Sequence, residues 1–174
     1  PVTGELSFLE CLDAAGTPPC APLPGALATP GFMGTASDLV VPHDGASLYA
    51  ATGNQTSLVG FTRDPGGGLE FAYCRHSSYG ASGDLPSCPI GAVEEVRQLE
   101  ASLDGRTIYI ADRGCADNTG DCFSNVKAYL RDPATSVLSE GRGSRPATYG
   151  TGPFAVKGGA GTVYQVDSEV GTIS

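Results

Sequence analysis

The stretch DLVVPHDGASLYAATGNQTSLVGFTRDPGGGLEF, residues 38–71, decides the fold because it contains one complete structural unit. Four short runs of apolar or alternating residues are separated by turn-forming residues: Asp44 and Gly45, then Gly53 and Asn54, then the glycines after Pro65. Period-two patterning between such turns is typical of short strands joined tightly. The stretch therefore predicts one antiparallel sheet of four strands.

This unit recurs further along the chain. LEASLDGRTIYIA, residues 99–111, carries an Asp-Gly turn followed by Tyr109, as the first unit carries its Asp-Gly turn followed by Tyr49. VKAYLRDPATSVL, residues 126–138, repeats GFTRDPGGGL, residues 60–69, including the Arg-Asp-Pro turn. A repeat of this length made only of strands predicts an all-β fold, a β-propeller of four-stranded antiparallel blades, because stacked neighbours bury what one blade leaves exposed.

Partial units stand at both ends of the sequence. GELSFLEC, residues 4–11, matches the fourth-strand sequence GGLEFAYC, and residues 161–174 match the second and third strands. The expected organisation is a fourth strand in 1–11, blades in 34–74 and 92–140, and an incomplete blade in 152–174.

About three blades' worth of strands cannot close a ring, because propellers typically have four to eight blades. Three completions stay open: two copies that close a ring, copies that propagate as a filament, or neighbouring blades of a longer polypeptide. The last two are favoured jointly, because the ends of the sequence fall inside a predicted hairpin. Self-association or neighbouring blades are thus the expected partners.

The repeated residues resemble a known family. The Asp-Gly turns followed by a Leu-Tyr or Ile-Tyr strand, the two Arg-Asp-Pro turns and the opening PVTGEL are similar to the lactonase-like, 6-phosphogluconolactonase-related propellers of extracellular repeat type. The resemblance covers most of the chain. It implies the propeller fold, and it implies lactone hydrolysis only for a complete ring that carries a charged cluster at its mouth.

The charge balance narrows the choice of partners. Nineteen Asp and Glu stand against ten Lys and Arg, and no basic cluster alternates with aromatic residues. Nucleic acid and anionic membrane surfaces are therefore expected to be repelled. No apolar run approaches the roughly 20 residues that span a bilayer, so membrane insertion is not expected.

The six cysteines fall into neighbouring pairs: Cys11 with Cys20, Cys74 with Cys88, and Cys115 with Cys122. Six cysteines allow 15 connectivities, and the propeller frame favours these local pairs. Zinc ligation is disfavoured because none of the spacings is Cys-x-x-Cys. Local disulfides predict a secreted or cell-surface protein, and each would contribute roughly 2 to 3 kcal/mol in the loop-closure treatment.

Charged residues on the predicted innermost strands are candidates for lining a central channel. VEEVRQLE, residues 93–100, is unusually charged for such a strand, and the matching strand of the first blade contains one carboxylate. The channel candidates are Asp38, Glu95, Arg97 and Glu100. Two interpretations stay open: a polar ligand site, or a solvated and ion-paired channel wall.

The predicted loop 111–122 holds the residues best suited to a metal ion: Asp112, Asp117, Asn118 and Asp121. Calcium prefers several carboxylate, amide and carbonyl oxygens on a tightly turning chain, so it is the expected cofactor if there is one. The spacing is not that of an EF-hand, and Asp, Asn and Gly also form ordinary turns. Asn54-Gln55-Thr56 is a glycosylation sequon on a predicted turn, which makes Asn54 a candidate for modification.

Catalytic motifs are scarce. The two histidines, His43 and His76, lie in predicted turn or loop segments and are expected to be exposed polar residues. No nucleophile elbow, phosphate-binding glycine loop or zinc-protease motif is present. The sequence therefore favours a non-enzymatic extracellular module for structural assembly, adhesion or filament formation through blade and strand complementation. The alternatives are part of a secreted lactonase-like hydrolase, or a module that binds calcium or glycans.

Overall fold

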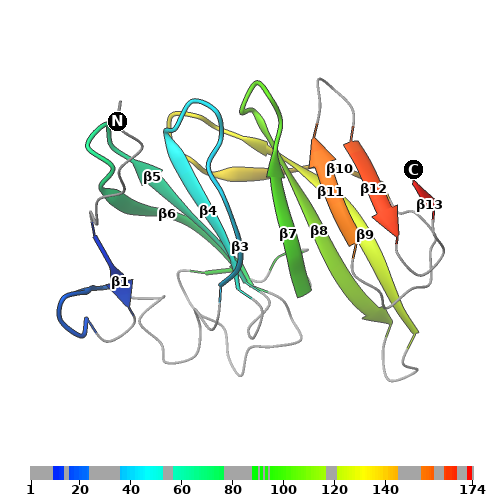
Figure 1. The fold of residues 1–174 in the computed structure, drawn as a ribbon, viewed down its shortest axis with the longest axis horizontal. Coiled ribbons are helices and arrows are strands. Elements are labelled where there is room, and N and C mark those ends of the chain that lie inside the picture. The colour runs from blue at the N-terminus through cyan, green and yellow to red at the C-terminus, as the bar shows by residue number, and fades with distance from the viewer. Residues whose placement is uncertain are drawn as a thin grey trace, which may run out of the picture.

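A computed structural model describes the chain at residues 10–13, 16–23, 36–52, 57–76, 88–89, 91, 93, 95–116, 121–144, 154–158, 163–167 and 172–173. The described secondary structure consists of β-strands (Figure 1). The predicted strand in 1–11 lies outside this part except for Glu10 and Cys11, and Asn54 lies outside it as well.

The first blade is the sheet formed by β3 (Ala36–Val40), β4 (Ser47–Thr52), β5 (Ser57–Arg63) and β6 (Leu69–His76), which pair antiparallel in sequence order. The described connections, residues 41–46 and 64–68, contain turns that the sequence marks with Gly, Asp and Pro. Gly45 has a φ of +68°, a left-handed conformation that glycine adopts without steric cost.

The second blade repeats this order with β7 (Glu95–Ala101), β8 (Thr107–Ala116), β9 (Asp121–Arg131) and β10 (Leu138–Ser144). Its central hairpin is longer than expected, because the predicted loop 111–122 is largely strand. The ladder continues until Ala116 faces Asp121, so the extra residues of this blade extend two strands instead of forming a loop. Residues 112–121 are rich in Asp, Asn and Gly, which indicated a loop and not two strands.

A third sheet contains β11 (Phe154–Gly158), β12 (Val163–Asp167) and β13 (Thr172–Ile173) in antiparallel sequence order, and β11 contacts β7 and β8. Near the amino terminus, β1 (Leu12–Asp13) pairs in parallel with β2 (Ala21–Pro22). Figure 1 shows the third sheet on one side of the second blade and β1 beside the opposite end of the first blade.

The main core lies between the two blades. Alternation along β4 and β8 sends Tyr49 and Ala51 of the first blade toward Ile108 and Ile110 of the second. The same cluster contains Leu58, Tyr73, Val93, Val96, Leu99, Tyr129 and Leu138. The opposite face of the first blade buries Val59 and Phe61 against Leu23 from the amino-terminal segment, with Leu12 packed at its edge.

The fold-class prediction is confirmed. Both complete sheets are four-stranded antiparallel meanders, and consecutive sheets pack face to face as propeller blades do. This stacking places the turn between β3 and β4 beside the turn between β9 and β10, where polar residues of the two blades meet.

Candidate functional site: the polar junction between blades

Two arginines end the third strand of their blades in the same way. Arg63 donates from Nη1 to the carbonyl of Gly45 at 3.1 Å, and Arg131 donates from Nη1 to the carbonyl of Gly105 at 2.8 Å. Both glycines belong to Asp-Gly turns and have φ near +68° and +67°. Each arginine therefore braces the Asp-Gly turn of its own blade.

Arg131 also crosses to the preceding blade. Its Nη1 lies 2.7 Å from Oδ2 of Asp44, and its Nε donates to Oγ of Ser47 at 3.0 Å. The arginine side chain is 1% exposed, whereas that of Asp44 is 41% exposed. Nε and Nη1 of this buried guanidinium both have fixed acceptors on the preceding blade. The contact therefore links the two blades in one register.

Neutral groups extend the contact. Ser47 and Ser136 share a hydrogen bond of 2.6 Å between their hydroxyls, and the hydroxyl of Tyr49 donates to the carbonyl of Ser136 at 2.8 Å. Ser136 has a φ of 59°, a left-handed conformation that a non-glycine residue adopts at a cost. We call the set Asp44, Ser47, Tyr49, Arg131 and Ser136 the blade junction.

Electrostatics at the blade junction follow from these contacts. Burial acts to raise the pKa of Asp44, but the hydrogen bond and the charge of Arg131, with the N–H of Ala46, outweigh it. The pKa of this carboxyl therefore lies below its usual value of 3.8. Burial raises the pKa of the Tyr49 phenol, so the hydroxyl remains a donor at ordinary pH.

The innermost strands are joined as well, and this involves one of the channel candidates. Asp38 Oδ2 accepts from the N–H of Leu99 at 2.7 Å, and the hydroxyl of Ser37 donates to the carbonyl of Val96 at 3.2 Å. Because β3 and β7 are edge strands of their sheets, these bonds satisfy edge groups of β7. Asp38 thus connects two blades.

The other channel candidates lie on β7. Glu95 and Arg97 form an ion pair with side chains 33% and 47% exposed, and Glu100 is partly buried. An ion-paired wall is the simpler of the two interpretations that the sequence left open. Whether these residues line a channel depends on further blades and stays a prediction.

The calcium candidates are not all within the described residues. Asp112 is fully buried in β8, where it forms an ion pair with Lys127 of β9. Asp121 begins β9, whereas Asp117 and Asn118 lie outside the described part. Among the described residues, no group of three or more His, Cys, Asp and Glu is arranged to hold a metal ion. Calcium binding stays a prediction, and Lys127 would compete with the ion for Asp112.

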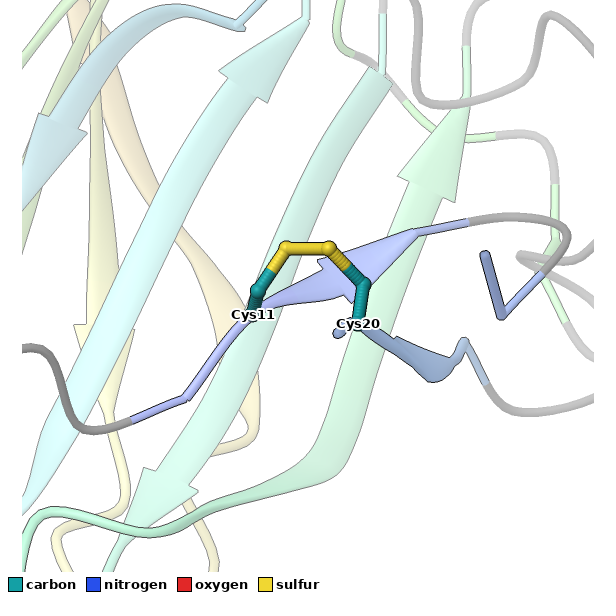
Figure 2. The surroundings of a disulfide bond; sticks show 2 residues. All are labelled: Cys11 and Cys20. Atoms are coloured by element: carbon teal, nitrogen blue, oxygen red, sulfur yellow. A yellow bond between two sulfur atoms is a disulfide. The ribbon is translucent and has the colours of Figure 1, made fainter. Parts of the chain in front are cut away.

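Two of the predicted disulfides are present. Cys11 is bonded to Cys20, which joins the residues directly before β1 and β2 (Figure 2), and Cys74 of β6 is bonded to Cys88. Cys115 and Cys122 occupy directly opposed positions of β8 and β9, and their side chains lie outside the description.

One sequence interpretation was wrong. His76 is the last residue of β6 and is 1% exposed, so it is not an exposed loop residue. The backbone N–H of His76 donates to the carbonyl of Pro89 at 3.4 Å, and the backbone carbonyl of His76 accepts from the N–H of Gly91 at 3.0 Å. The segment after the second disulfide folds back on β6, a long-range contact that local patterning does not indicate. His43 is exposed in its turn, as expected.

The blade junction itself was not predicted as a site. The signal was present in the sequence, since the Asp-Gly and Arg-Asp-Pro turns recur together in both blades. Sequence reasoning treated these residues as turn formers within one blade. Only the stacking of the blades shows that the Arg of one unit reaches the Asp of the unit before it.

Comparison with known proteins gives structural neighbours alone. No protein-family model matches the chain, and no curated protein matches it. A candidate 6-phosphogluconolactonase from Bacteroides fragilis is 14% identical over 78% of this chain and 36% of its own, with a TM-score of 0.46. The corresponding protein from Bacteroides uniformis is 15% identical over 78% and 37%, with a TM-score of 0.45.

A protein from Lactobacillus plantarum is 14% identical over 78% of this chain and 39% of its own, with a TM-score of 0.44. The chain therefore spans well under half of the length of each of these neighbours. At such identities and TM-scores, the fold assignment rests on the sheet order and packing of the chain itself.

No helix of the described part is long and apolar enough to cross a membrane.

Proposed function

We propose that this chain is a structural, non-enzymatic β-propeller segment that builds an assembly by docking blade upon blade. The observation that supports this most directly is the blade junction, in which Arg131 is 1% exposed and bonded to Asp44 and Ser47 of the neighbouring blade. These contacts bring together the repeated residues of consecutive units. In this proposal, the repeated Asp-Gly and Arg-Asp-Pro turns attach one unit to the next.

Exposed apolar side chains of the second blade suit a further docking partner. Leu103, Leu130 and Val137 are 67%, 54% and 42% exposed, although Leu and Val are usually buried. Exposed apolar surface on a soluble protein commonly marks a contact with another protein or domain. The occupant we propose is another blade, from a second copy or from the same polypeptide.

The proposed setting is extracellular. Two disulfides, Cys11–Cys20 and Cys74–Cys88, support an oxidising compartment, since such bonds are rare in reducing cytosol. Adhesion to glycans or calcium-dependent binding would fit the same setting. Those roles would be tested by glycan-array binding and by the effect of a chelator on the melting temperature.

The test of the assembly role is particle mass by light scattering, with negative-stain microscopy for shape. The chain has a mass of 17.7 kDa, and we expect particles of at least twice that mass. Leu130→Ser should reduce their abundance, because it replaces an exposed apolar side chain of the second blade by a polar one. A compact monomer at all concentrations would contradict self-assembly.

The second proposal, part of a lactonase-like hydrolase, is supported by the sequence resemblance of the repeated turns. It requires lactone hydrolysis by a propeller that contains this chain. Measuring lactone turnover by such a complete protein separates the two proposals. The Arg131→Met variant, which changes the blade junction alone, is measured beside it. Absence of turnover in the complete protein would remove the hydrolase.

A further inference from the structure

The two Arg-Asp-Pro turns are built alike, but among the described residues only Arg131 has a neighbouring blade across its turn. Arg63 and Arg131 each end a third strand and each bind the glycine carbonyl of their own Asp-Gly turn. Gly67, with a φ of 97°, stands where Ser136, with a φ of 59°, stands in the second blade. Asp64 and Asp132 close the two turns with their carboxylates. The first blade thus presents the arginine and the carboxylate-closed turn of the second blade, with Gly67 in place of Ser136.

The space in front of the first turn differs from that in front of the second. A Cβ added to Gly105 would meet Pro42 of the preceding blade at 3.4 Å as well as Nη1 of Arg131. Within the described part of the chain, a Cβ added to Gly45 would meet Nη1 of Arg63 alone. Among the described residues, Arg63 forms no ion pair, and it is partly exposed.

We propose that Arg63 and the carbonyl of Gly45 form a docking half-site for the acidic Asp-Gly turn of a further blade. The carboxylate of that turn would take the place that Asp44 takes on Arg131. This proposal rests on the proposed function, blade docking, and names its partner by chemistry.

Charge complementarity selects this occupant over the third sheet of a second copy. The turn between β11 and β12 has the sequence Gly159-Ala160-Gly161-Thr162, which contains no carboxylate where the second blade has Asp104. A ring of two copies would bring that turn to Arg63 and leave a guanidinium with no acid to pair with, which is unfavourable. A blade with an Asp-Gly turn satisfies it.

The same face of the first blade already binds a carboxylate from the preceding unit. Glu10 accepts from the N–H of Leu69 at 2.6 Å, at the start of β6. Leu12 and Leu23 pack on the apolar cluster of this face. Residues 4–11 are the predicted fourth strand of a preceding blade, which is the blade that we propose as the occupant.

The first experiment measures the reactivity of arginine side chains in the full chain with phenylglyoxal, followed by mass spectrometry. We expect Arg63 to be modified at least tenfold faster than Arg131, because only the latter is covered. Equal protection of both arginines at low protein concentration would overturn the proposal, because the half-site would already be filled. Protection that appears only at high concentration would identify a second copy as the occupant and would also overturn it.

The second experiment supplies the missing partner. A copy of residues 36–64 is fused directly before Pro1, so that its Arg-Asp continues into Pro1 and residues 4–11 can complete the added blade. We expect Arg63 to become about as protected as Arg131, with at least a tenfold loss of reactivity. The matched control carries Asp44→Asn in the added copy only and should leave Arg63 reactive.

The outcomes separate this inference from the proposed function. If the added strands fold, as measured by amide exchange, but Arg63 stays reactive, the half-site is refuted while blade docking stands. If the added strands remain unprotected from exchange, blade docking itself is contradicted, and with it the proposed function. Protection of Arg63 that persists in the Asp44→Asn control would refute the role of the carboxylate.

Discussion

The turns at Arg63 and Arg131 have the same sequence pattern and the same internal hydrogen bond, yet their surroundings differ. Arg131 is 1% exposed and reaches Asp44 and Ser47 across the junction, whereas Arg63 is partly exposed and holds only its own turn among the described residues. Local sequence therefore determines the turn, and the neighbouring blade determines how much each arginine contributes to stability. Variants at matched positions of the two blades test this difference, and the largest effect is expected at the arginines themselves.

Replacing each arginine with methionine tests the comparison most strongly. Arg131→Met keeps an apolar stem but removes a buried charge from Asp44 and Ser47, and we expect a loss of about 2 to 3 kcal/mol in the free energy of unfolding. Arg63→Met should cost less than about 1 kcal/mol, as is usual for partly exposed sites. Urea unfolding followed by circular dichroism measures both. Equal losses would mean that the two turns are equally covered.

Removing one hydroxyl in each blade tests the neutral part of the junction. Tyr49→Phe leaves the buried carbonyl of Ser136 without its donor, so we expect a loss of about 1 to 2 kcal/mol. Tyr109→Phe, at the matching position of the second blade, should change stability by less than about 0.5 kcal/mol. The same unfolding measurement applies. A larger effect at Tyr109 would show that the second blade has a partner of its own there.

The glycines of the Asp-Gly turns provide a smaller contrast. Alanine at either Gly45 or Gly105 must adopt a left-handed conformation, which costs about 1 to 2 kcal/mol. Gly105→Ala should cost no more than Gly45→Ala, because its Cβ would meet Pro42 at 3.4 Å, an ordinary van der Waals contact. Thermal unfolding of the two variants side by side gives the difference. A clearly lower melting temperature for Gly105→Ala would contradict this spacing of the two turns.

The smallest effect concerns pH. Asp44 has a lowered pKa in the folded chain, so its contribution to stability is present above its usual pKa of 3.8 and is lost as the pH falls through the folded value. The difference in unfolding free energy between the unmodified protein and Asp44→Asn should therefore shrink below about pH 4. In the Arg131→Met background, this pH-dependent difference should largely vanish.

Asp104 provides the matched control for pH. Its pKa is also lowered, but by the hydroxyl of Ser102 and the N–H of Arg106 within its own turn. Asp104→Asn should therefore change the pH dependence of the unfolding free energy by the same amount in the unmodified protein and in the Arg131→Met background. If it changed with Arg131→Met, the two acids would be coupled across the blade, contrary to the contacts described.

The sequence predicted the strands well because alternation and turn residues are local signals. Each Asp-Gly turn appears between the expected strands, and Gly45 and Gly105 adopt the left-handed conformation that suits glycine. The extension of β8 and β9 was missed, since polar residues at 112–121 conceal a ladder that depends on pairing with the facing strand. The burial of His76 was missed because its backbone pairs with Pro89 and Gly91, which lie just after the disulfide-bonded Cys88 and far along the chain from β6.

The sequence by itself determined the four-stranded unit, its repetition and two of the local disulfides, because these depend on contacts between residues close along the chain. Only the tertiary structure decided what the repeated Asp and Arg do. They lie 87 residues apart, and they meet because Tyr49, Ile108 and their neighbours bury a shared apolar face between the blades. That burial fixes the register of the two blades, and the register brings Arg131 to Asp44.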